Sequence, residues 1–308
     1  MHRILPFLLL ALSLCQDVSA GADRLILVSS LLEEHHTRFR DELASALAPT
    51  TLDEHRLPPA GREPHPLPPL QAAGTPLIIT AGARACAQGL SQAQQPVLCT
   101  FITEAAYRRL AGQARAPRHS ALFLEQPLSR QLNLASLLLP PDGGLVVLRP
   151  QAATDADSLR AAAVRAGVSL SILTLPPGDN PARRIQQGMD RHQMLLALPD
   201  PAIYNRHSIH GILLTTYRKG IAVIGFSDSF VKAGAIAAVH STPEDMARAS
   251  ADIASVFLAD TETGLPAPAH PSRFTVTLNH RVAQTLSLAL PPEARLHDQL
   301  RDMEAGTR

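Results

Sequence analysis

The sequence contains no tryptophan, and aromatic residues make up only 4% of its 308 residues. Proteins that bind single-stranded nucleic acid or carbohydrates often stack these ligands on aromatic rings. The scarcity of aromatic residues therefore argues against both kinds of binding site. An excess of one charge is also missing, because 28 Lys and Arg residues against 27 Asp and Glu residues leave a formal net charge of +1. We therefore expect a globular protein that is neither disordered nor a nucleic-acid binder.

Motifs for catalysis and nucleotide binding are missing as well. The stretch "GFSDS" (225–229) lacks the second glycine of a nucleophile elbow, and neither a GxGxxG motif nor a Walker loop follows a strand. Asp200 and Asp228 could form the acid pair of a hydrolase, but nothing nearby identifies a sugar subsite. We therefore expect no enzyme activity and no cofactor.

Metal sites also lack support, although the chain has 13 histidines. His207 and His210 stand three residues apart on an expected helix, and the acidic and histidine residues of 33–36 open another. Neither group has the further ligands at fixed spacing that a metal requires. We expect solvated helix faces and no bound metal.

The longest apolar run, "ILPFLLLALSL" (4–14), is too short to span a membrane. It follows a short basic start and precedes the small and medium-sized residues 18–20. This is the pattern of a secretory signal peptide that covers residues 1–20. The bulky Leu14 before Cys15 argues against a lipid anchor. The mature chain is expected in the periplasm.

Two cysteines remain after that cleavage, Cys86 on an expected helix and Cys99 on the strand that follows it. An oxidising compartment favours a disulfide between them. Two buried thiols are the alternative, and the sequence leaves both open. Their spacing does not fit a metal site.

Apolar strands alternate with helical segments along most of the chain. Such continuous apolar strands, linked by helices, are typical of parallel sheets that are covered on both faces. The sequence therefore predicts an α/β protein with doubly wound parallel sheets. The expected strands cover 24–30, 76–82, 96–101, 144–150, 168–175, 193–200 and 221–226.

Two breaks interrupt the alternation. The stretch 56–74 carries six prolines and is expected to form an extended surface excursion rather than a helix. Within the second break, 115–144, residues 121–124 predict a strand that leads from one sheet to the next, and a helix follows at 129–139. Strand and helix units on both sides of residue 120 therefore suggest two lobes of similar plan.

Polar side chains follow several of these strands. In doubly wound sheets, ligands bind beyond the carboxyl ends of the strands, where helix N-termini offer free N–H groups. Each residue alone could simply cap the next helix, but the set as a whole predicts a cleft for a small polar ligand. The set includes Ser29, Ser30, Gly82, Thr103, Arg149, Gln151, Asp200, Ser227 and Asp228.

Three segments carry a resemblance to a known family. They are "QPLSRQLNLASLLLPPDGGLVVLRP" (126–150), the region from "LPDPAIYN" (198–205) to "AAVHSTPEDM" (237–246), and the tail "PSRFTVTLNHRVAQTLSLALPP" (271–292). The chain resembles periplasmic substrate-binding proteins of ATP-binding-cassette transporters, in a branch with the type I binding-protein fold that includes aromatic amino-acid binders.

The resemblance implies two lobes joined by three crossings around a hinge and a cleft. It implies a monomer that has no cofactor, binds a small-molecule ligand and docks on a membrane permease. The first lobe would hold residues 21–118, completed by about 239–262, and the second would hold 119–238, completed by about 263–308.

Positions carried over from the resemblance fall on both sides of the expected cleft. Ser29, Gly82 and Ala83 would form the wall of the first lobe. Together with the strand-end residues, the expected ligand-binding set is Ser29, Ser30, Gly82, Ala83, Thr103, Gln151, Asp200, Ile203, Tyr204, Phe226, Ser227 and Asp228.

Two functions follow from this pattern. The first is a receptor that captures a small polar solute and delivers it to an importer of the ATP-binding-cassette class. The second is a periplasmic sensory or adaptor protein of the same fold, which acts with a membrane sensor kinase or an outer-membrane receptor.

Overall fold

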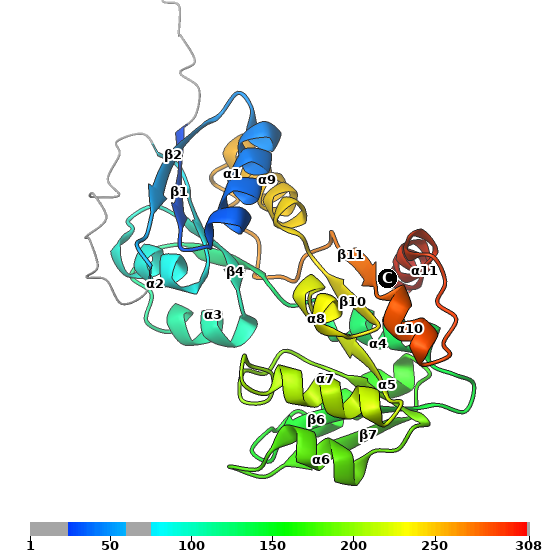
Figure 1. Ribbon diagram of the computed structural model, residues 1–308. Helices are drawn as coiled ribbons and strands as arrows, with labels where there is room; N and C mark the ends of the chain where they lie inside the picture. Colours follow the sequence, from blue (N-terminus) through cyan, green and yellow to red (C-terminus); the bar gives the residue numbers. More distant parts are fainter. Residues whose placement is uncertain (1–23, 60–74, 307–308) are drawn as a thin grey trace, which may run out of the picture.

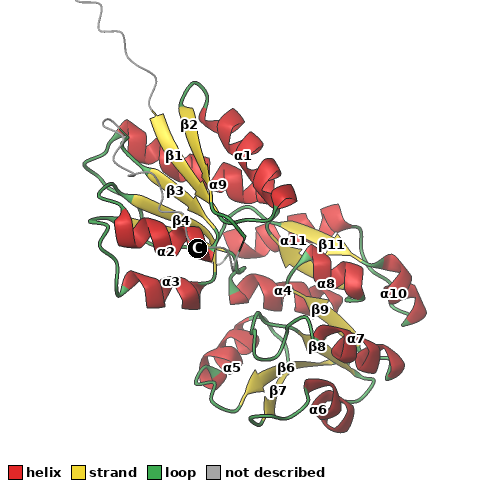
Figure 2. Ribbon diagram, turned by 60° about the vertical axis from the view of Figure 1, so that its left-hand side comes forward, coloured by secondary structure: helices red, strands yellow, loops and turns green. Residues whose placement is uncertain are grey.

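A computed structural model describes residues 24–59 and 75–306 of the chain (Figure 1). The predicted signal peptide and residues 60–74 of the proline-rich stretch lie outside the described residues. The described chain forms two lobes, each built around its own β-sheet and covered by helices, as the two views in Figures 1 and 2 show.

The first sheet has five strands in the order β2-β1-β3-β4-β5. All of its neighbouring strands are parallel. Its strands are β1 (Arg24–Ser29), β2 (Thr51–Arg56), β3 (Ile78–Ala81), β4 (Val97–Ile102) and β5 (His119–Phe123). The helices of this lobe are α1 (Glu33–Leu47), α2 (Ala83–Gln92), α3 (Glu104–Ala111) and α9 (Pro243–Ala259).

The second sheet has six strands in the order β11-β10-β9-β8-β6-β7, and only the β10–β11 pair is antiparallel within the described chain. Its strands are β6 (Gly144–Pro150), β7 (Leu170–Leu175), β8 (Gln193–Leu196), β9 (Ala222–Gly225), β10 (Ala237–His240) and β11 (Thr275–Leu278). Its helices are α4 (Leu128–Leu138), α5 (Ala156–Arg165), α6 (Pro181–Gly188), α7 (Ile209–Arg218), α8 (Asp228–Ala233), α10 (His280–Thr285) and α11 (Glu293–Ala305).

The parallel two-sheet architecture agrees with the predicted fold class, and three details differ from the sequence-based expectation. Strand β5 pairs with β4, so residues 119–123 belong to the first sheet and not to the second lobe. Strand β2 was not predicted, because its polar sequence, "TLDEHR", forms a half-exposed edge. Strand β10 was also not predicted, because only the six-residue helix α8 separates it from β9, so it does not stand out as a separate strand and helix unit.

Each sheet buries apolar side chains on both faces. Helices α1 and α9 cover one face of the first sheet around Phe39 and Phe257, while Cys86 and Tyr107 of α2 and α3 lie in the core on the other face. The second sheet is covered by α4, α5, α10 and α11 on one face and by α6, α7 and α8 on the other. Among the described residues, no helix combines the length and the apolar character that crossing a membrane requires.

A disulfide joins Cys86 of α2 to Cys99 of β4, with 5.3 Å between their Cα atoms. Of the two alternatives that the sequence leaves open, the structure has the bonded one. Both residues are fully buried between helix and sheet. The bond therefore fixes α2, whose first residues lie at the sheet edge described below.

Replacing both cysteines, Cys86→Ala with Cys99→Ala, should lower the free energy of unfolding by about 3 kcal/mol. The disulfide closes a loop in the unfolded chain, and without it the unfolded state gains conformational entropy. Urea unfolding of the oxidised wild type and of the double variant measures this difference. Wild type treated with a reductant is the control and should match the variant. Equal stability of the oxidised wild type and the variant would contradict the expectation.

Three segments connect the lobes, and hydrogen bonds link them to one another. They run from β5 to α4, from β10 to α9 and from α9 to β11. Gln126 Nε2 of the first segment donates to Ser241 Oγ of the second at 2.9 Å. Ser241 Oγ donates to the carbonyl of Arg273 in the third at 2.6 Å. The three segments therefore form one connected hinge.

Glu125 lies in the first of these segments and carries a half-buried carboxylate. Both of its oxygens accept the backbone N–H of Glu104, at 3.1 and 3.2 Å. Burial raises the pKa of Glu125, and the nearby charge of Glu104 adds to this, although backbone hydrogen bonds and His270 act in the opposite direction. The folded chain therefore holds a proton on Glu125 more tightly than the unfolded chain does.

Because the pKa of Glu125 is raised in the folded state, its contribution to stability is present at acid pH and is lost as the pH rises above the ordinary value for Glu. Glu125→Gln removes this loss, so the stability of the variant relative to wild type should increase from acid to neutral pH. Urea unfolding at both pH values measures it, with the exposed Glu262→Gln as control. An equal difference at both pH values would contradict the raised pKa.

Candidate functional site

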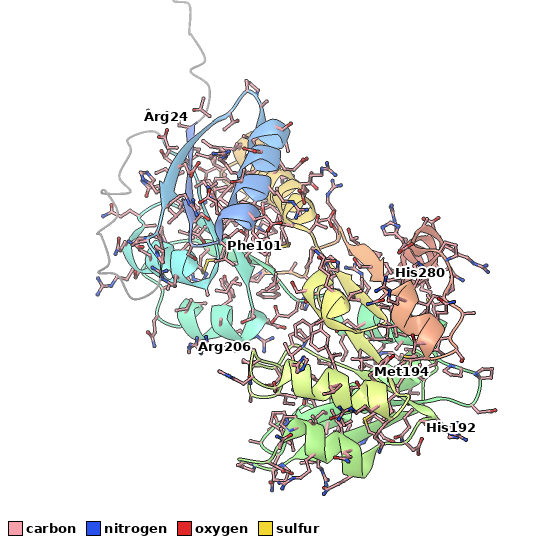
Figure 3. All side chains as sticks on the ribbon, in the orientation of Figure 1. Arg24, Phe101, His192, Met194, Arg206 and His280 are labelled. Atoms are coloured by element: carbon pink, nitrogen blue, oxygen red, sulfur yellow. A yellow bond between two sulfur atoms is a disulfide. The ribbon has the colours of Figure 1, made fainter. Side chains whose placement is uncertain are left out.

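The expected ligand-binding residues lie at the carboxyl-end edges of the two sheets. In the first lobe Ser29 ends β1 and Gly82 follows β3, and in the second lobe Phe226 follows β9. Figure 3 labels Phe101 near the end of β4 and Arg206 in the loop before α7, on the sides of the two lobes that face each other. The structure thus divides the predicted set into two facing groups, one on each lobe.

Ser30 and Gly82 shape the start of α2 in the first lobe. The Ser30 hydroxyl donates to the carbonyl of Ala81 and accepts the N–H of Ala85, each at 3.3 Å. Gly82 has φ +98°, and a Cβ at this position would lie 2.4 Å from Ser30 Oγ, so only glycine fits. The N–H of the exposed Ala83, at the first helical position, has no partner within the helix.

Three hydroxyl groups of the predicted set serve the backbone of their own lobe. Thr103 Oγ1 accepts the N–H of Ala106 and caps α3, and Ser227 Oγ accepts the N–H of Phe230 and caps α8, both at 3.2 Å. Ser29 is buried, and its hydroxyl accepts the N–H two residues further on. The capping role that the sequence leaves open is therefore present at both helix starts.

Asp200 lies beyond β8 and is held in place by two kinds of contact. One carboxylate oxygen accepts the N–H of Ala202 at 3.0 Å and closes a turn. The other lies 3.4 Å from Arg149 of β6, whose guanidinium also makes a 2.6 Å contact with Asp155. Asp200 is thus neutralised by a cation at the end of the adjacent strand, a pairing that sequence spacing does not reveal.

Charged side chains oppose one another where α8 faces the first lobe. Within the second lobe, Asp228 pairs with Lys232 at 2.6 Å. Within the first lobe, Arg38 holds Glu244 with two hydrogen bonds, which raise the pKa of Arg38. Across the lobes, Asp228 raises the pKa of Arg38 further, and Glu34 raises that of Lys232. Arg38 acts in the opposite direction on Lys232 and lowers its pKa, so both attraction and repulsion act across the gap.

An aromatic cluster lies beneath the edge of the second lobe. The ring of Tyr204 lies 6.0 Å from that of Phe226 and 5.8 Å from that of Phe230, and the two phenylalanines are 5.0 Å apart. Tyr204 is 6% exposed, and its hydroxyl is buried without a hydrogen-bond partner. Burial, and secondarily the charge of Asp200, raise the pKa of Tyr204. Ile203 is fully buried and belongs to the core, whereas Phe226 is half-buried.

Some residues at these edges were not singled out from the sequence. Phe101 has φ +52°, which is rare for a side chain of this size, and its half-exposed ring packs edge to face on Phe39 at 5.2 Å. Leu32, just before α1, is 78% exposed. Phe101 could have been identified from the sequence, because it is an aromatic residue at the end of the expected strand 96–101. Gln151, which was expected at the site, has an exposed side chain after β6.

The histidine pairs do not assemble metal sites. His36 is buried and bonds the carboxylate of Glu54 at 2.8 Å, so it is not on a solvated face as expected. His207 lies in the turn before α7, which begins at Ile209, so it does not share a helix with His210. Among the residues that the structure describes, no group of three acidic, histidine or cysteine side chains could hold a metal ion.

Two shallow cavities, of about 600 and 450 Å³, lie at the opposite, amino-end edge of the first sheet. They share Pro117, which precedes β5. Their polar linings include Gln94 and Arg115 in one and Arg118 and Glu262 in the other. Neither cavity includes a residue of the predicted ligand-binding set.

Comparison with known proteins gives matches by structure but not by sequence. No protein-family model and no curated protein matches the chain. A ligand-free, open structure of a substrate-binding protein with adhesive properties from Clostridium difficile is 12% identical and has a TM-score of 0.66, over 88% of this chain and 96% of that one. The ABC domain in complex with L-Trp from Streptococcus pneumonia is 14% identical, with a TM-score of 0.58 over 91% and 98%.

A periplasmic ribose ABC transporter protein from Conexibacter woesei is 9% identical, with a TM-score of 0.52 over 88% of this chain and 96% of that chain. At these identities the similarity establishes the fold and not the ligand. The agreement extends over nearly the full length of each neighbour and includes both lobes. The chain therefore has the type I periplasmic-binding-protein fold, with two parallel-sheet lobes joined by three crossings.

Proposed function

We propose that the chain is an exported solute-binding protein, which captures a small polar molecule between its lobes and delivers it to a membrane permease of an ATP-binding-cassette importer. The observation that carries this proposal is the arrangement of the two sheets. Their carboxyl-end edges, with the helix starts that follow them, face each other across a three-segment hinge (Figure 1). Binding without catalysis fits this arrangement, and three proteins of the same fold are an L-Trp complex, a substrate-binding protein and a periplasmic ribose ABC transporter.

The proposed ligand would meet backbone groups and aromatic rings as much as polar side chains. Thr103, Ser227 and Asp200 already have partners within their lobes. The N–H of Ala83, at the start of α2, and the half-exposed ring of Phe226 are the groups left for a ligand on either side. We expect the solute to lie between these two groups.

The pairing of these side chains also supports a second candidate function. A periplasmic sensory or adaptor protein would keep the fold without keeping the ligand contacts, and its partner would be a membrane sensor kinase or an outer-membrane receptor. In that case the capping bonds of Thr103 and Ser227 would be the whole role of these residues.

Thermal unfolding of the mature chain in the presence of amino acids, small carboxylates and sugars tests the receptor function. A bound ligand at about 100 times its Kd should add roughly 2.7 kcal/mol to the free energy of unfolding. Absence of any shift across such a library would count against the receptor and favour the adaptor.

For a ligand found in this way, Ser227→Ala should weaken binding as measured by calorimetry, because the Ser227 cap orders the start of α8 directly after Phe226. Asn279→Ala is the matched control, because Asn279 also caps a helix, α10, by accepting the N–H of Val282 at 3.1 Å. It follows the antiparallel β11 and therefore lies at the opposite edge of the sheet. Equal effects of the two variants would remove Ser227 from the site.

Tyr204→Phe tests whether the buried hydroxyl is unpaired in the ligand-free protein. Because the group is buried without a partner, its removal should leave the free energy of unfolding unchanged or raise it by up to about 1 kcal/mol. Tyr107→Phe is the control, since its hydroxyl bonds His119 at 2.8 Å and its loss should cost about 1 kcal/mol. Urea unfolding measures both. A destabilised Tyr204→Phe would show that the hydroxyl has a partner in solution.

A further inference from the structure

Arg130 of α4 is a charged residue in the interior of the hinge region, with only 3% of its surface exposed. Its guanidinium makes two hydrogen bonds to the carboxylate of Glu304 in α11, at 2.5 and 2.9 Å. It also donates to the side-chain oxygen of Gln126 at 2.6 Å and to the carbonyl of Pro271 at 2.9 Å. The ring of Phe274 lies 4.2 Å from the guanidinium carbon.

These partners come from different parts of the hinge. Gln126 belongs to the first connecting segment, while Pro271 and Phe274 belong to the third. Gln126 passes the network on to Ser241 of the second segment, which bonds the carbonyl of Arg273. One side chain is thus connected to all three segments, directly or through a single intermediate.

Glu304 lies near the end of the last helix and reaches the hinge from outside it. Helix α11 packs on α4 and β11 through Leu296 and Leu300, which are fully buried in the core of the second lobe. The ring of His297 also lies 4.7 Å from that of Phe274. Apolar packing therefore fixes α11 to the lobe, and Glu304 extends from this fixed helix to hold Arg130.

A buried ion pair is a poor source of stability, because removing two charges from water costs about as much as their attraction returns. Its use lies more in selecting one arrangement over others. Arginine suits this role, since its planar fork holds several acceptors in fixed directions. If Arg130 only stabilised the second lobe, its pair with Glu304 would be enough. Its bonds to Gln126 and Pro271 hold segments that lie outside both sheets.

We infer that Arg130 is a positioning residue that sets the angle between the two lobes, and that the C-terminal helix braces it through Glu304. The inference concerns the hinge and does not depend on the identity of the ligand or on whether a ligand binds. The lobes can rotate only between arrangements in which the Arg130 guanidinium stays bonded to Gln126 of the first connecting segment and to Pro271 of the third.

The distribution of distances between the lobes tests this inference. Two exposed positions, Ser45 of α1 and Gln187 of α6, are changed to cysteine and carry spin labels, whose separation is measured by pulsed electron paramagnetic resonance. Cys86 and Cys99 are joined in a disulfide and do not take up the label, and Cys15 is removed by Cys15→Ser. The labelled chain with wild-type Arg130 and Glu304 is expected to show one main distance.

Glu304→Gln and Arg130→Lys should reveal a second arrangement of the lobes, with its own distance between the labels. Its population should be about tenfold higher than in wild type, which corresponds to the loss of one strong charge-assisted contact. Arg301→Gln changes an exposed residue of the same helix and is the matched control. Its distances should equal those of wild type. Unchanged distances in Glu304→Gln and Arg130→Lys, together with a lower melting temperature, would overturn the inference and leave Arg130 as a structural residue of one lobe.

Gln126→Met provides an independent arm in case the charge variants do not fold. It removes the bonds to Arg130 and Ser241 while the Arg130–Glu304 pair remains intact. The distance distribution should broaden in this variant as well. A distribution as narrow as that of wild type would contradict the connection of Arg130 to the hinge. None of these measurements uses a ligand, so their failure is distinguishable from failure of the proposed solute binding.

Discussion

The common direction of the strands is the constraint on which the rest of the structure depends. Parallel strands joined by helices must end at one edge of their sheet, and the helix that follows each strand must begin there. In the first lobe this rule places the starts of α1, α2 and α3 at one edge. In the second lobe it does the same for α7 and α8. The antiparallel β11 is the exception, and it follows the segment that returns the chain from the first lobe.

This geometry also explains why so many polar side chains at these edges are already paired. A helix that begins at a sheet edge has several N–H groups without intrahelical partners, and a nearby hydroxyl satisfies one of them at little cost. Thr103 and Ser227 do this directly, and Ser30 does it for α2 from the end of β1, the strand next to β3 in the sheet. Under the proposed function, recognition then depends on the remaining backbone groups and on Phe226.

The extent to which the sequence predicts this structure depends on how local the signal is. Buried strands such as 144–150 carry an apolar run that identifies them, and their bounds agree with β6. Strand β10 is apolar, but only the short α8 separates it from β9, so it does not stand out in the alternation. The polar β2 lacks an apolar run, because its place is decided by its pairing with β1. The same holds at the site, where the partner of Asp200 is Arg149, fifty-one residues away. Pairing between strands fixes that contact, and no spacing along the chain encodes it.

The two lobes are linked by forces of different range. At short range the hinge is held by directional bonds around Arg130, which restrict how the lobes can rotate. At longer range the charges of α8 and of the first lobe act on each other, since Asp228 raises the pKa of Arg38 and Glu34 raises that of Lys232, while Arg38 lowers that of Lys232. Exposed charges of this kind are weak and screened by salt, so they bias an approach without locking it. Under the proposed function, hinge bonds that select one arrangement and a weak interaction across the gap leave the shift to a closed arrangement to the binding energy of the ligand.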